Sequence, residues 1–108
     1  MTLTDLKNAL VSVSSSTYHY TAPDNKGFPR IVFAEDGADD LICNDVHAER
    51  IITGTIDLFS KTENDPLISA TESALNGLQI GWRLNNVIYE EDTHVIHHEW
   101  VFSMYAEI

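Results

Sequence analysis

The sequence predicts an α+β fold in which a mostly antiparallel β-sheet carries two helices packed on one face. Apolar residues recur at helical spacing near the N-terminus and again after residue 65, while apolar and polar residues alternate strictly in the last part of the chain. Turn residues, and not helices, separate most of the expected strands, which favours antiparallel pairing. The 108 residues are expected to form one domain, 1–108, and a single cysteine excludes an internal disulfide.

The first helix is expected to begin at Thr2 or Thr4, since either side chain can cap it. Leu6 and Leu10 belong to its apolar stripe, and the serine run 14–16 ends it, because serine side chains compete for backbone hydrogen bonds. A strand is expected over residues 17–21. The loop that follows, 22–29, holds two prolines, an asparagine and a glycine.

The middle of the chain is expected to form further strands. Residues 30–34 are rich in β-forming side chains, an acidic turn is expected over 36–40, and 41–43 is either a brief strand or part of a loop. Alternation over residues 46–60 predicts a half-buried strand with Ile56 and Leu58 on one face and Asp57 on the other.

A second helix is expected directly after Asp65, which can cap it, with Pro66 at its first position and Gly77 at its end. Its stripe includes Leu67 and Leu78, and Glu72 is expected to face water.

Two strand segments, 79–83 and 87–90, flank Asn85-Asn86, which make either a tight turn or a bulge. The last strand is expected over 93–108. Its alternation places Trp100, Phe102 and Met104 on an apolar side and sends the adjacent His97 and His98 to opposite faces.

The side chains that could support catalysis or metal binding do not form a known motif. Among His94, His97, His98 and Glu99, at most His97 and Glu99 share a side of the strand. The acidic run after Asp36 lacks the spacing of a calcium loop, and Cys43 lacks an evident orienting group. The sequence therefore predicts no catalytic residues, no metal site, no cofactor and no enzymatic activity.

Charge and hydropathy restrict the partners further. Seventeen acidic and six basic residues give a net charge of −11, which argues against binding to DNA phosphates or to an anionic membrane. No apolar run approaches the length of a membrane span, and the N-terminus lacks the features of a signal peptide, so the chain is expected in the cytosol or in a particle assembled there.

Four stretches from Pro29 onward follow one another in a characteristic order and spacing: Pro29-Arg30-Ile31-Val32-Phe33, residues 40–45, residues 56–61 with Asn64-Asp65-Pro66, and residues 87–91 with 104–108. In this order and spacing the sequence resembles the tail-terminator, or tail-completion, proteins of long-tailed bacteriophages, which are minor tail components of the virion. The N-terminal third matches only in being a helix followed by a strand.

This resemblance implies a homo-oligomeric ring, typically a hexamer, at the head-proximal end of the tail. Such a ring caps the tail-tube protein and joins the tail to the head connector protein, and DNA passes through it without sequence-specific binding. It is assembled in the cytoplasm of the bacterial host. The alternatives are a head-completion or connector protein, and a host cytosolic acidic binding or inhibitor module. The residues expected at the ring interface or lumen are Asp36, Asp39, Asp40 and Asp45.

Overall fold

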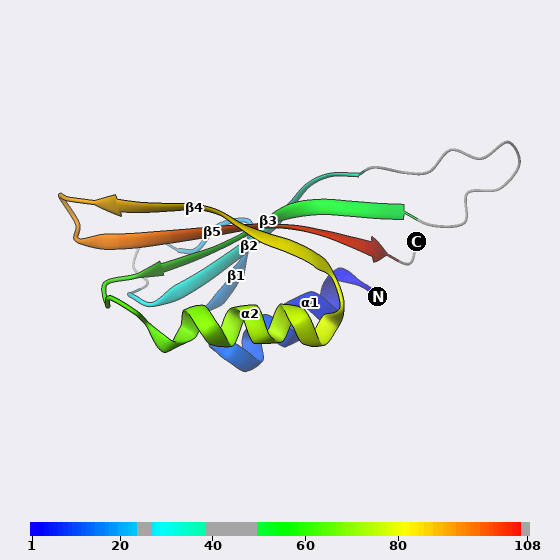
Figure 1. Cartoon of the computed structure of the whole chain (residues 1–108), viewed down its shortest axis with the longest axis horizontal. Helices are drawn as coiled ribbons and strands as arrows, with labels where there is room; N and C mark the ends of the chain where they lie inside the picture. Colours follow the sequence, from blue (N-terminus) through cyan, green and yellow to red (C-terminus); the bar gives the residue numbers. More distant parts are fainter. Residues whose placement is uncertain (24–26, 39–49, 107–108) are drawn as a thin grey trace, which may run out of the picture.

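The computed structural model describes residues 1–23, 27–38 and 50–106, in which five strands form one sheet and two helices lie on one of its faces (Figure 1). Across the sheet the strand order is β1-β2-β3-β5-β4, and neighbouring strands pair antiparallel except β1 and β2, which are parallel. This confirms the predicted α+β fold. The elements are α1 (Leu3–Val13), β1 (Thr17–His19), β2 (Arg30–Ala38), β3 (Arg50–Ser60), α2 (Pro66–Leu78), β4 (Gly81–Glu90) and β5 (Val95–Ala106).

Helix α1 begins with a reciprocal cap, which selects Thr2 from the two expected residues. The Asp5 backbone N–H donates to Thr2 Oγ1 (3.2 Å), and the Thr2 backbone N–H donates to Asp5 Oδ2 (2.8 Å). The helix ends where the Ser14 N–H donates to the Leu10 carbonyl (3.0 Å), as the serine run predicts. Neither helix in the described part of the chain is long and apolar enough to cross a membrane.

Helix α2 begins as predicted but ends later. Asp65 accepts a hydrogen bond from the Leu67 backbone N–H (2.9 Å), and the Ser60 hydroxyl at the end of β3 donates to the same carboxylate (2.6 Å). The prediction that Gly77 ends the helix is wrong. The helix continues through Leu78 and ends at Gln79, which adopts the left-handed conformation with φ 60°.

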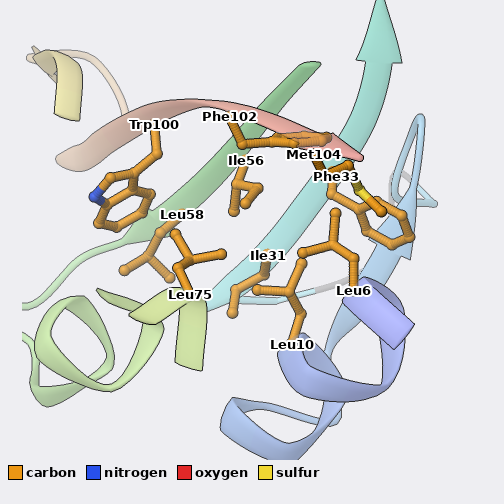
Figure 2. Close-up of a cluster of buried hydrophobic side chains, with 10 residues drawn as sticks. All are labelled: Leu6, Leu10, Ile31, Phe33, Ile56, Leu58, Leu75, Trp100, Phe102 and Met104. Atoms are coloured by element: carbon orange, nitrogen blue, oxygen red, sulfur yellow. The ribbon is translucent and has the colours of Figure 1, made fainter. Parts of the chain in front are cut away.

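The hydrophobic core lies between the helices and one side of the sheet, here called the helix face (Figure 2). Leu10 of α1 points toward Ile31, and Leu75 of α2 points toward Leu58. Glu72, expected in water, is half-buried instead, because the Trp100 indole N–H donates to its carboxylate (2.9 Å). The buried core residues are Leu6, Leu10, Ile31, Phe33, Ile56, Leu58, Leu75, Trp100, Phe102 and Met104.

Two bulges change the expected strand boundaries. Strand β2 continues to Ala38 through a bulge between Glu35 and Gly37, so the turn expected over 36–40 does not begin at Asp36. Strand β4 is continuous through a bulge between Leu84 and Asn86, which decides between the two readings of Asn85-Asn86 in favour of a bulge. The expectations for 41–43 and 46–49 lie outside the described residues.

Strand β5 alternates as predicted but is shorter, because Thr93 and His94 belong to the turn after β4. His94 has φ 59°, and its backbone N–H donates to the Glu90 carbonyl (2.8 Å), which closes that turn. Val95–Ala106 then pairs with β3 on one side and β4 on the other, and β3 occupies the middle of the sheet.

Candidate functional site

Of the four aspartates expected at an interface or lumen, the structure describes only Asp36. Its side chain is exposed at the β2 bulge, where the Thr53 hydroxyl donates to Oδ1 (3.1 Å). Asp36 also lines a shallow hollow that includes Thr53 and Arg83. Asp39, Asp40 and Asp45, like Cys43, lie outside the described residues.

The sheet surface opposite the helices, here called the open face, carries a histidine beside two carboxylates. Across β3 and β5, His97 Nε2 lies 2.6 Å from Asp57 Oδ1, and both side chains are less than one-fifth exposed. The Phe59 ring stacks on His97 with 4.4 Å between ring centroids. Glu99 pairs with Asp57 in the strand register and accepts a hydrogen bond from the Asn85 amide (2.8 Å).

The adjacent residues His97 and His98 lie on opposite faces of the sheet, as predicted, and their pKa values shift in opposite directions. The hydrogen bond to Asp57 raises the pKa of His97 above its ordinary value, although burial opposes this. Burial among the helix-face side chains lowers the pKa of His98. The two-residue repeat of a strand predicts that these histidines lie on opposite faces. It does not predict that Asp57 is the partner of His97, because Asp57 lies 40 residues earlier in the chain.

The residue types of this cluster are those of a metal site. Ligand atoms of Asp57, His97 and Glu99 lie within 4.8 Å of one another. However, His97 Nε2 already faces the Asp57 oxygen, and the raised pKa of His97 favours a protonated ring whose nitrogen has no lone pair to give. The arrangement therefore supports an ion pair, and the absence of a metal site stays a prediction.

Replacing His97 with glutamine is expected to destabilise the fold most below about pH 6. Because the pKa of His97 is higher in the folded chain than in the unfolded chain, the pair stabilises fully below the unfolded-state pKa and loses this contribution as pH rises through the folded-state pKa. The stability gap between wild type and His97→Gln, measured by urea unfolding, is expected to narrow by about 1 kcal/mol from pH 5.5 to pH 9. If the stability difference between wild type and His97→Gln stays constant or widens as pH rises, the ion pair is contradicted.

Strand β4 carries exposed apolar side chains that sequence reasoning did not single out: Leu84, Val87, Ile88 and Tyr89. A signal was present in the sequence, because these four large apolar residues fall within six positions that hold no lysine or proline. Without the strand order, however, the same segment fits an interior strand equally well.

No known protein-family model matches the sequence, and neither does any curated protein. The fold is similar to that of a chain in a solved structure described as "Virion of native gene transfer agent (GTA) particle". The similarity covers 92% of this chain and 84% of that chain, with a TM-score of 0.61 and 13% sequence identity. At this identity, the similarity is one of fold.

Proposed function

We propose that this chain is a non-enzymatic virion assembly protein of the tail-terminator type, whose ring caps the tail tube and joins the tail to the head connector. The observation that carries the proposal is the fold shared over 92% of the chain with a component of a gene transfer agent virion. The ordered resemblance from Pro29 onward supports it independently, because it was found in the sequence and not in the fold.

The charge distribution also supports a ring around DNA. If the helices lie outside, the open face lines the channel, and it presents Glu99, with Asp36 at the β2 bulge, while the charge of Asp57 is balanced by His97. Together with the net charge of −11, these carboxylates keep DNA phosphates from binding to the wall while the genome moves. Asp39, Asp40 and Asp45 are proposed to act in the same way or at the subunit contact.

The proposal predicts assembly on a template. The mass of the purified protein is expected to rise to that of a ring over a concentration series, or when tail-tube protein is added, and electron micrographs are expected to show rings at one end of each tube. Tubes of limited length in its presence, against tubes that continue to grow in its absence, are the functional readout. A protein that neither forms rings nor caps tubes would sink the proposal.

A head-completion or connector protein is the alternative within virion assembly. The same preparation distinguishes the two, because a connector protein is expected to bind purified heads and leave tube growth unchanged. A tail terminator is expected to limit tube growth before any head is added.

A further inference from the structure

The sheet ends at β4 in a strand whose outer side is unpaired in the described part of the chain. In the described part of the chain, β4 pairs with β5 on one side, and no strand pairs with its other side (Figure 1). Four of its large apolar side chains are about half exposed: Leu84 44%, Val87 50%, Ile88 44% and Tyr89 54%. Soluble proteins usually protect such an edge with lysine, proline, a bulge or a covering segment. Strand β4 has a bulge between Leu84 and Asn86, but residues 86–90 beyond it contain neither lysine nor proline. This edge is therefore suited to pair with another strand.

The opposite edge of the sheet is formed by the short strand β1, and exposed apolar side chains flank it too. Tyr20, which is 57% exposed, ends the strand with φ 72°. Val11 of α1 is 40% exposed and lies next to Leu10, whose carbonyl accepts a hydrogen bond from the β1 hydroxyl of Thr17 (3.2 Å). Both edges thus present apolar surface to solvent.

The register places the two edges at the same height along the strands. Thr17 pairs with Ile31, and the pairing continues across the sheet through Leu58 and His98 to Val87. The pairing directions make β1 and β4 antiparallel to each other. If copies are arranged around an axis parallel to the strands, the β4 edge of one copy meets the β1 edge of the next in antiparallel orientation.

Opposite charges lie at the matching ends of these edges. Glu90 at the end of β4 and Glu91 and Asp92 in the turn after it are exposed, and these three residues are here called the hairpin tip. Ser60, the residue before Lys61, lies level with Tyr89 because both pair with Ile96, so Lys61 is at the same end of the sheet. Its side chain reaches over the Phe28 ring, with Nζ 5.2 Å from the ring centroid. The Arg30 guanidinium lies 4.6 Å from the same centroid, at the start of β2 next to β1. Phe28 and Lys61 form the cationic end, and Arg30, which makes interactions within its own subunit, lies beside them.

These charges favour a contact between copies. With a net charge of −11, two copies repel over most of their surfaces, so a stable contact requires a local match of opposite charge. The hairpin tip lies on the β4 side of the sheet, and Lys61 extends toward the β2 side. Among the described residues, no ion pair joins the hairpin tip to Lys61 within one subunit.

We propose that the β4 edge of each copy pairs with the β1 edge of a second copy and that the hairpin tip of the first copy lies against the cationic end of the second. The contact joins two different surfaces, so it repeats from copy to copy and can close into a ring with one continuous sheet. This inference rests on the proposed function, since it names the contact by which that ring forms.

The test is a charge exchange measured through the mass of the assembly at low salt. Glu91→Lys and Lys61→Glu are each expected to weaken assembly about tenfold. The variant that combines them keeps the net charge of −11 and is expected to return to within about threefold of wild type. Ser73→Glu is the control, because it adds a negative charge at an exposed position of α2, on neither edge strand, and is expected to assemble like the wild type.

A second variant tests the strand contact itself. Val87→Lys places a charge in the pairing edge and is expected to weaken assembly by about a hundredfold or more, with circular dichroism used to show that the subunit remains folded. Rings that form and cap tubes equally well in all variants would overturn this contact and leave the proposed function standing. If self-association is lost in the single variants and restored in the combined variant, but no variant and no wild-type protein caps tubes, the contact between copies would stand and the proposed function would be overturned.

Two further outcomes would reject the proposed contact. If Val87→Lys abolishes tube capping but not self-association, the β4 edge binds the tail-tube protein, and the contact between copies is wrong. A wild-type protein that shows no self-association, alone or on tubes, would overturn both proposals.

Discussion

Replacing Trp100 with alanine is expected to lower the free energy of unfolding by about 3–5 kcal/mol, which is a large part of the total stability of a small domain. Trp100 is fully buried on the helix face and packs in the core with Ile56, Leu58 and Leu75. Its removal leaves a cavity between the sheet and the helices, and it leaves Glu72 without its indole donor. This change in the free energy of unfolding is measured by equilibrium unfolding in urea, monitored by circular dichroism.

Two further substitutions separate the causes of this effect. Trp100→Phe keeps an aromatic ring but removes the donor to Glu72, so it is expected to cost less than Trp100→Ala. Tyr105→Ala removes another large aromatic side chain from the same strand, where it is 61% exposed, and is expected to change stability by less than about 1 kcal/mol. Equal costs for Trp100→Ala and Tyr105→Ala would mean that β5 does not face the helices as described.

Replacing Gly54 with alanine is expected to destabilise the fold by about 2–3 kcal/mol. A β-carbon at this position would run into the carbonyl oxygen of Ala34 on β2 and would lie 2.8 Å from ring atoms of Phe102 on β5. The backbone carbonyl belongs to a paired strand and cannot turn away, so either the sheet must open at the β2 bulge or Phe102 must leave its buried position. The measurement is again urea unfolding.

Gly77→Ala is the matched control for Gly54→Ala. A β-carbon at Gly77 would meet nothing within 4 Å, and the residue lies inside α2 with an ordinary backbone conformation. Alanine is expected to stabilise the chain here by about 0.5–1 kcal/mol, because it favours the helix. If both substitutions shift stability in the same direction, the close approach of strands at Gly54 is wrong.

These two sites also bear on the proposed ring. Gly54 lies in the middle strand beside the bulge that carries Asp36, and Trp100 anchors the strand that holds β4 in place. Since both act on the folded subunit, variants at either site are expected to lose assembly only together with stability. The charge exchange between Glu91 and Lys61, in contrast, is expected to change assembly while the unfolding curves stay alike.

Local sequence was enough to predict the helices and the alternation of the last strand. The Thr2 cap, the Asp65-Pro66 start and the serine run end each depend on atoms within a few residues of one another. The faces of His97 and His98 follow from the two-residue repeat of any strand. Local signals were less reliable at ends and bulges. Gly77 was expected to end α2, but Gln79 adopts the left-handed conformation and caps the helix, and β2 continues through Asp36 because it pairs with β3 from elsewhere in the chain.

The sequence by itself determined the fold class, and it contains no recognisable catalytic motif. Only the tertiary structure decided which strand lies at the edge, that Asp57 meets His97, and that Gly54 lies under Phe102. The physical reason is the range of the interactions. Caps and alternation come from neighbours along the chain, whereas strand order and cross-strand contacts depend on how distant segments share one core, and it is this order that leaves β4 uncovered.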